Sequence, residues 1–375
     1  MIQRFLLDEL LEKLNHSSKI ILIYGARQVG KTTLVKQLLS QVPYKSLSIN
    51  ADEEKYNDVF SSRDLTKMRM LTDGYELLFI DEAQRIPDIG INLKILHDAL
   101  PELKIIATGS SSFELANRTQ EPLTGRTWTF SLFPISFSEL RQQQNLFELN
   151  HGLETFLRFG AYPDVFSLPN QADKVQFLTQ LTRSYLYKDI LELSTIKHPD
   201  KIKKLLQLLA FQAGSEVSLN ELGNTLQMSK DTVASYIDLL EKAFVVFRLS
   251  GFSRNLRKEV VKMDKIYFYD LGVRNALVNN FNTLDFRTDV GQLWENFLVV
   301  ERLKNNAYQR RFVNSYFWRT YTGAELDYIE EADGQLAGFE FKFSDKTAKP
   351  PQSWLEAYPN SDFKCINRSN YWEFI

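Results

Sequence analysis

A glycine-rich segment near the start of the chain constrains the fold more than any other feature of the sequence. Residues Gly25 to Thr32 read G-A-R-Q-V-G-K-T and match the pattern G-x-x-x-x-G-K-[ST]. An apolar run from Ile20 to Tyr24 precedes the segment, and a helical pattern begins at Thr32. A strand, this loop and then a helix form the context that the motif requires. The segment therefore predicts a phosphate-binding loop at the end of a buried strand.

The backbone of this loop determines its chemistry. Its glycines let the chain wrap so that several amide N–H groups point at a β-phosphate, and the following helix N-terminus adds partial positive charge. Lys31 is predicted to reach the β- and γ-phosphates of ATP, and Thr32 to offer its hydroxyl to Mg²⁺. The predicted nucleotide-binding residues are Gly25, Ala26, Arg27, Gln28, Val29, Gly30, Lys31, Thr32 and Thr33. The alternative is a chance match to the pattern, which the strand–loop–helix context makes rare.

Two acids follow another apolar run, Leu77 to Ile80. The carboxyl ends of the strands in a parallel sheet face the ligand crevice, so Asp81 and Glu82 are expected beside the phosphate loop. Asp81 would hold the Mg²⁺ ion, directly or through water. Glu82 would orient and polarise the water that attacks the γ-phosphate. The alternative is a strand followed by two solvated acids.

A further strand ends in small polar residues, and two arginines follow it. Ser110 is the first candidate to contact the γ-phosphate or its water, and Thr108 is the second; ordinary turn chemistry is the competing interpretation.

Arg126 is the first candidate for an arginine finger, acting within its own chain or on a neighbouring one, and Arg118 is the second. A solvated surface arginine is the alternative for Arg126.

Apolar runs of strand length alternate with amphipathic stretches in the first part of the chain. A helix is expected from Phe5 to Leu14. The expected strands are Lys19 to Tyr24, Ser46 to Ile49, Glu76 to Ile80 and Lys104 to Thr108. This alternation predicts an α/β fold with a parallel sheet covered by helices on both faces. After about residue 140 the pattern becomes helical, and strands return near the end of the chain.

The net charge and the cysteine content exclude some classes of protein. The formal net charge is -2, so the chain is not basic overall. Cys365 is the single cysteine, so no internal disulfide can form. Asp8, Glu9 and Glu12 interrupt what would be the apolar core of a signal peptide. The longest apolar runs are strand-length and far too short to span a membrane. We therefore expect a cytoplasmic protein with no membrane association.

The middle of the chain resembles a helix-turn-helix. Ser218 can cap a helix over Leu219 to Leu226, and Ser229 can cap the next helix, which runs to Ala243. A basic segment, Arg254 to Lys258 with Lys262 and Lys265, would form a wing that contacts DNA phosphates. The second helix is poor in Arg, Asn and Gln, the residues that usually contact base edges. Any DNA binding is therefore expected to involve the phosphates of the DNA backbone. The alternative is a winged helix used for packing.

Four charged residues near the end suggest a second site. Asp327 lies on one predicted strand and Glu340 with Lys342 on the next, and a hairpin around Asp333-Gly334 would bring them together. Glu295 lies on a preceding helix and could add an acid. The D…E-x-K spacing resembles restriction-endonuclease-like nucleases, in which Asp327 and Glu340 would bind Mg²⁺ and Lys342 would position water. The alternatives are a solvated strand face, or an inactive nuclease-like domain used for binding.

Several motifs together resemble one family. GARQVGKTT, LLFIDEAQ, ATGSSS and LTGR followed by FSLFP are similar to those of bacterial and archaeal AAA-type ATPases that carry a C-terminal domain of unknown function. The resemblance implies an ATPase domain, a winged helix and a nuclease-like end domain, and it supports Ser110 and Arg126. The expected domains are 1–145 (P-loop ATPase), 146–200 (helical linker), 201–282 (winged helix) and 283–375 (small nuclease-like α/β).

The sequence therefore predicts an ATP-binding protein with slow Mg²⁺-dependent hydrolysis. Its nucleotide state would control the C-terminal domains, with DNA as a partner. The competing hypothesis is a non-catalytic nucleotide switch whose end domain docks a protein partner.

Overall fold

The computed structural model describes residues 2–110, 123–186, 199–253 and 263–375. The chain divides into two compact units, the first formed mainly by Met1–Pro134 and the second mainly by Ile135–Tyr187, Ile196–Glu241 and Val245–Ile375. Arg118 and the basic segment 254–258 with Lys262, which the sequence singled out, lie outside the described residues.

The first unit is built on a parallel sheet of five strands in the order β2-β3-β4-β1-β5. The strands are β1 (Ile20–Tyr24), β2 (Ser46–Asn50), β3 (Leu77–Asp81), β4 (Lys104–Gly109) and β5 (Thr127–Ser131). All five residues of β1 are buried, as expected of a strand covered on both faces. The α/β fold and the strands predicted in this part of the chain are confirmed.

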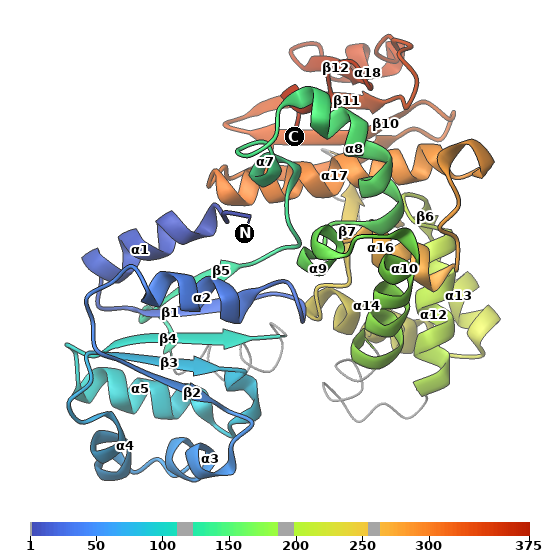
Figure 1. The fold of residues 1–375 in the computed structure, drawn as a ribbon. Helices are drawn as coiled ribbons and strands as arrows, with labels where there is room; N and C mark the ends of the chain where they lie inside the picture. The colour runs from blue at the N-terminus through green and yellow to red at the C-terminus, as the bar shows by residue number, and fades with distance from the viewer. Residues whose placement is uncertain (1, 111–122, 187–198, 254–262) are drawn as a thin grey trace. The chain divides into compact units, whose positions relative to one another are not determined.

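Helices cover both faces of this sheet, as Figure 1 shows. They are α1 (Leu6–His16), α2 (Lys31–Leu39), α3 (Glu54–Phe60), α4 (Leu65–Thr72), the 3-10 turn η1 (Ala83–Arg85) and α5 (Ile89–Ala99). Phe60, Met68 and Leu93 from α3, α4 and α5 share a core with alternate strand residues such as Leu22 and Ile80. The intervening strand residues point to the opposite face, where α1 packs against β1 and α2.

The second unit begins with helices, as the sequence predicts. They are α7 (Phe137–Leu140), α8 (Leu146–Phe159), α9 (Pro163–Ser167), α10 (Gln171–Gln180), the π-helix η2 (Leu181–Leu186), α12 (Pro199–Phe211), α13 (Leu219–Leu226), α14 (Lys230–Lys242) and α16 (Leu271–Leu277). Side-chain caps fix several of their starts: Ser218 accepts the Glu221 amide at the start of α13, and Asn145 and Glu148 form a capping box on α8.

A sheet of seven strands, in the order β12-β11-β10-β9-β7-β8-β6, organises the rest of this unit. The strands are β6 (Glu216–Val217), β7 (Val246–Gly251), β8 (Asp264–Phe268), β9 (Asn314–Arg319), β10 (Glu325–Ala332), β11 (Gln335–Phe341) and β12 (Asp362–Ile366); the later helices are η3 (Leu284–Phe286), α17 (Val290–Tyr308), α18 (Gln352–Ala357) and η4 (Tyr371–Glu373). β7 and β9 pair in parallel through Ser250 with Tyr316 and Gly251 with Phe317. One sheet thus crosses the boundary that the sequence placed between 201–282 and 283–375.

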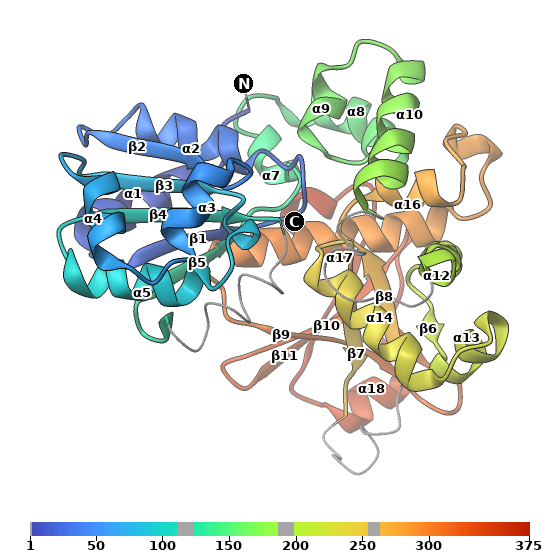
Figure 2. The same cartoon turned by 90° about the horizontal axis from the view of Figure 1, so that it is seen from below.

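Helix α17 lies along this sheet (Figures 1 and 2). The Asn296 side chain accepts the Phe268 amide at 2.9 Å and donates to the Phe268 carbonyl at 2.8 Å, which ties the helix to β8. Farther along, Arg302 donates to both carboxylate oxygens of Glu330 on β10, at 2.8 and 2.6 Å. The helix therefore contacts strands from both sides of the expected boundary.

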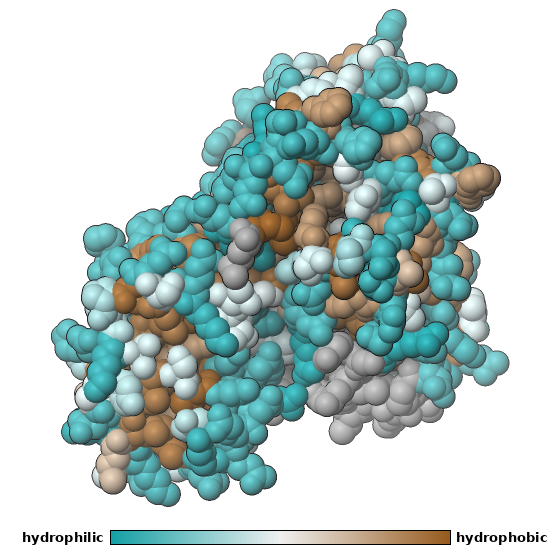
Figure 3. Space-filling model, viewed as in Figure 1, coloured by the Kyte–Doolittle hydropathy of each residue, from teal (hydrophilic) through white to brown (hydrophobic). Residues whose placement is uncertain are grey.

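Hydrophilic residues dominate the face of the molecule drawn in Figure 3, and apolar residues reach that face in small areas between them. Within the described ranges, every helix is too short or too polar to cross a membrane.

Candidate functional site

The glycine-rich loop connects β1 to α2 at the carboxyl edge of the first sheet. Gln28 and Gly30 have φ angles of 62° and 97°, so the chain turns through left-handed conformations just before the helix. The Leu132 amide donates to the Tyr24 carbonyl at 2.7 Å, which brings the chain after β5 against the loop. A Cβ atom on Gly25 would lie 2.3 Å from the Leu132 carbonyl oxygen. Glycine is therefore required at this position.

Lys31 opens α2 and is buried, with 5 % of its surface exposed. Its Nζ atom donates to the carbonyl oxygens of Gly25 and Ala26 at 2.8 and 3.0 Å, so the side chain folds back over its own loop. Phosphate oxygens placed inside the loop would be reached by the same ammonium group. Val29 is buried beneath the loop, and Thr33 is exposed on the helix.

Thr32 and Asp81 meet at the end of β3. The Thr32 hydroxyl donates to Asp81 Oδ2 at 2.7 Å, and the Thr108 hydroxyl of β4 donates to Oδ1. Hydroxyl and carboxylate oxygens are the hard donors that Mg²⁺ prefers. Thr32 and Asp81 thus fit the role of magnesium ligands at the phosphate loop.

Glu82, Gln84 and Ser110 form a second part of the site. Glu82 has a left-handed backbone with φ of 54°, and its amide donates to the Thr108 hydroxyl at 3.3 Å. The Gln84 Nε2 atom donates to Glu82 Oε2 at 2.5 Å and to Ser110 Oγ at 3.0 Å. Sequence reasoning missed Gln84, although a polar residue two positions after the paired acids was a signal that could have marked it.

Arg126 lies away from the phosphate loop of its own chain. Its carbonyl accepts the Ile20 amide at 2.9 Å, which places it at the first residue of β1, whereas the loop follows the last. Five strand residues span about 13 Å. The guanidinium donates to Asp98 at 2.8 and 3.1 Å. In this structure Arg126 therefore lies at the opposite end of β1 from the phosphate loop. Its role as an arginine finger, within its own chain or on a neighbouring one, stays a prediction.

The second unit brings together the charged residues predicted near the end of the chain. The β10–β11 hairpin turns at Asp333 and Gly334, both with left-handed φ, as the sequence suggests. Strand pairing reaches Tyr328 with Phe339, and beyond it the Asp327 carboxylate accepts the Phe341 amide at 2.7 Å. Lys342 Nζ contacts Glu340 Oε1 at 2.6 Å.

Glu295 on α17 lies near the Asp327 carboxylate. It accepts hydrogen bonds from Lys265 Nζ at 2.9 Å and from the Tyr267 hydroxyl at 2.6 Å, both on β8. Lys265 is 8 % exposed. The expectation that Lys265 belongs to a DNA-contacting wing is thus wrong, because its ammonium is buried against Glu295. Burial, followed by the nearby Glu295 and Glu340 carboxylates, raises the pKa of Asp327 to about 8, against the opposing effects of Lys265 and the Phe341 amide.

Asp327 and Glu340 offer the oxygen donors that the predicted Mg²⁺ site needs. The Glu340 carboxylate is paired with Lys342 in this structure. In the part of the chain that the structure describes, no three His, Cys, Asp or Glu residues are grouped to hold a metal ion. Mg²⁺ binding at Asp327 and Glu340 therefore stays a prediction.

Three families match successive parts of the chain. Residues 17–141 match a family described as "AAA domain", residues 150–284 match "Domain of unknown function (DUF8612)", and residues 290–368 match "Domain of unknown function (DUF4143)". The fold and these matches show an AAA-type P-loop ATPase domain followed by two domains of unknown function.

Two relatives and one solved structure are similar over most of the chain. "Uncharacterized protein MJ1637" of Methanocaldococcus jannaschii is 31% identical to this chain. The similarity covers 79% of this chain and 71% of that protein, and the two belong to the same family. "Uncharacterized protein Rv2008c" of Mycobacterium tuberculosis is 28% identical over 87% of this chain and 71% of its own. The fold is similar to that of the Walker-type ATPase PABY2304 of Pyrococcus abyssi, with a TM-score of 0.53 and 16% sequence identity. The similarity covers 74% of this chain and 96% of that one.

Proposed function

We propose that the protein binds ATP with Mg²⁺ and hydrolyses it. The contact between the Thr32 hydroxyl and the Asp81 carboxylate, at 2.7 Å, carries this proposal. It joins the phosphate loop to the end of a second strand and gathers two magnesium-type donors beside Lys31 and Glu82. The AAA-type family and fold support it.

The roles of the residues follow from their positions. The loop amides and Lys31 hold the phosphates, and bound Mg²⁺ supplies charge that offsets the negative phosphate oxygens. Glu82 accepts a proton from water as the water oxygen bonds to the γ-phosphorus. The bond from that phosphorus to the β–γ bridging oxygen breaks, and ADP leaves with the electron pair. Ser110 contacts the γ-phosphate by its hydroxyl, and Arg126 acts on a neighbouring copy.

Two substitutions test this assignment. Lys31→Ala is expected to abolish ATP binding, measured by equilibrium titration with a fluorescent ATP analogue in magnesium buffer. Glu82→Gln is expected to retain binding and to lower phosphate release by about 100-fold or more, within the range of general-base effects. Tight binding by Lys31→Ala, or unchanged turnover by Glu82→Gln, would contradict the proposal.

The nucleotide state controls the second unit in this proposal, with DNA as its partner. The helix-turn-helix order of α13 and α14, followed by the paired strands β7 and β8, supports a winged helix. The rival function is a nucleotide switch that binds ATP without turnover and docks a protein partner. Steady-state phosphate release with and without DNA separates them: stimulation by DNA, weakened by added salt, favours the first, and stoichiometric binding without turnover favours the second.

DNA cleavage at Asp327, Glu340, Lys342 and Glu295 is a separate hypothesis. We derive no cleavage step from these residues, and an inactive nuclease-like domain used for docking is the alternative. Nicking of supercoiled plasmid with magnesium decides between the two. Nicking by the wild type that is lost in Asp327→Ala would establish cleavage.

A further inference from the structure

Gln84 occupies the point where two predicted catalytic groups of the first unit come closest. Its side chain is buried, with 7 % of the residue's surface exposed, on the short turn η1 after Glu82. A single atom, Nε2, donates to the Glu82 carboxylate at 2.5 Å and to the Ser110 hydroxyl at 3.0 Å. Glu82 comes from the end of β3 and Ser110 from the end of β4, so the amide joins two strand ends.

The orientation of this amide follows from the charge beside it. Turning the amide over would point its carbonyl oxygen at the Glu82 carboxylate, and two acceptors would then face each other. With Nε2 toward the carboxylate, the Gln84 Oε1 atom is buried without a hydrogen-bond partner. A buried carbonyl without a partner is costly, and it persists where stronger contacts fix the side chain. The contacts with Glu82 and Ser110 are therefore the ones that place Gln84.

We propose that Gln84 is a positioning residue for ATP hydrolysis, which fixes the Glu82 carboxylate and ties it to the Ser110 hydroxyl. An N–H donor to a carboxylate selects one orientation of that carboxylate, and a fixed orientation holds the oxygen that accepts a proton from water. When Ser110 contacts a γ-phosphate, the shared Nε2 atom transmits that contact to Glu82. The inference rests on the proposed function and names a further residue of the same site.

Two substitutions separate this role from simple packing. Gln84→Met keeps the length of the side chain and removes the donor. Gln84→Glu keeps the shape of the side chain and replaces the N–H donor with an acceptor that faces the Glu82 carboxylate. The matched control is Gln41→Glu, the same chemical change on an exposed residue just after the C-terminal end of α2.

The experiment measures ATP affinity and kcat for phosphate release, with thermal unfolding as a check of folding. Both Gln84 variants are expected to bind ATP within about two-fold of wild type. Each should lower kcat by about 10-fold, so that turnover falls while affinity is kept. Gln41→Glu should leave ATP affinity and kcat unchanged.

The outcomes distinguish this inference from the proposed function. Wild-type kcat in both Gln84 variants would overturn the role of Gln84 alone. Loss of ATP binding in a folded Gln84 variant would also overturn it, because the residue would then shape the phosphate loop. Absence of turnover in the wild type would overturn hydrolysis itself. If Gln84→Met does not fold, kcat and ATP affinity of Gln84→Glu decide.

Discussion

Asp81 shows how single residues prepare the nucleotide site. Its two carboxylate oxygens accept different hydroxyls, from Thr32 of the helix after the loop and from Thr108 of a neighbouring strand. Three segments distant in sequence thereby meet at one carboxylate. Such preorganisation lets binding energy be used on the phosphates and not on assembling the site.

Asp327 gives a prediction at the same scale. Burial, with Glu295 and Glu340 nearby, raises its pKa from 3.8 to about 8. Between these values the folded chain binds more protons here than the unfolded chain, so this contribution to stability is complete below about pH 4 and is lost as the pH rises through about 8. In urea denaturation, the free energy of unfolding of Asp327→Asn is expected to fall less steeply with pH than that of the wild type. Identical slopes would contradict the assignment, and Asp333→Asn, on the exposed hairpin turn, is the matched control.

Local spacing was enough to predict that Thr32 and Asp81 lie together, because each stands at a fixed place relative to a strand end. The structure brings their side chains into contact at 2.7 Å, and their roles stay predictions. Gln84 was missed because its contact with Ser110 depends on how β3 and β4 are paired. Lys265 was misplaced because its basic neighbours suggested an exposed loop, whereas the ammonium pairs with Glu295, which lies far along the chain.

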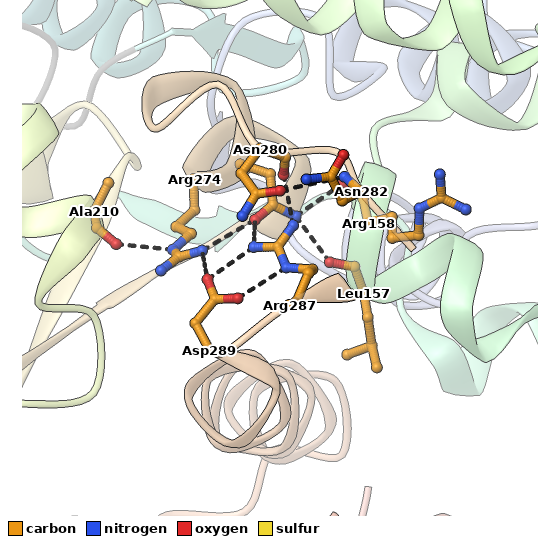
Figure 4. A network of polar contacts seen from close by, with 9 residues as sticks. Leu157, Arg158, Ala210, Arg274, Asn280, Asn282, Arg287 and Asp289 are labelled. Atoms are coloured by element: carbon orange, nitrogen blue, oxygen red, sulfur yellow. Dashed lines mark hydrogen bonds and ion pairs between the residues drawn. The ribbon is translucent and has the colours of Figure 1, made fainter. Parts of the chain in front are cut away.

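At the scale of elements, a buried ionic network fastens helices of the second unit (Figure 4). Arg274 on α16 donates to the Ala210 carbonyl of α12 at 2.8 Å and also pairs with Asp289, just before α17. Arg287 contacts Asp289 through both its Nε and Nη2 atoms, at 2.8 Å each. One carboxylate thus serves two buried guanidinium groups. Burial alone would raise the pKa of Asp289, but Arg287 and Arg274 outweigh it and lower the value to about 2.

Asp289→Ala is expected to destabilise the second unit by about 3–5 kcal/mol, because it leaves Arg274 and Arg287 buried without their carboxylate. Their side chains are 2% and 0% exposed. Urea denaturation of the full chain gives the change in the free energy of unfolding. Asp285→Ala, at an exposed position four residues earlier, serves as the control and should change it by less than about 0.5 kcal/mol. An equally small effect of Asp289→Ala would show that the network contributes little.

Elements with strong periodicity were predictable, and their long-range pairing was not. The run Ile20 to Tyr24 is apolar throughout and became the fully buried strand β1. The sequence also indicated the β10–β11 hairpin around Asp333 and Gly334. It gave no sign that β7 pairs with β9, because that pairing joins residues more than 60 positions apart and depends on the register of Gly251 with Phe317.

At the scale of the whole molecule, the seven-stranded sheet changes how the C-terminal half is divided. Strands from the region expected to be a winged helix and strands from the expected end domain share one ladder of hydrogen bonds. Helix α17 reinforces the connection, because its Asn296 bonds to Phe268 of β8 and its Arg302 bonds to Glu330 of β10. A change in β7 or β8 would therefore be transmitted directly to the strands that carry Asp327 and Glu340.

This arrangement predicts that the end domain cannot fold by itself. A fragment of residues 283–375 would expose the edge of β9 and the face of α17 that packs on β8, and unpaired edges and exposed apolar surface favour aggregation. We expect this fragment to lack a cooperative unfolding transition and near-ultraviolet circular dichroism. A fragment of residues 135–375, which retains β7, β8 and α17 together, should show both. Cooperative unfolding of 283–375 at the same denaturant concentration as 135–375 would mean that the β7–β9 pairing and the contacts of α17 are dispensable, and that the boundary near residue 283 separates independent folding units.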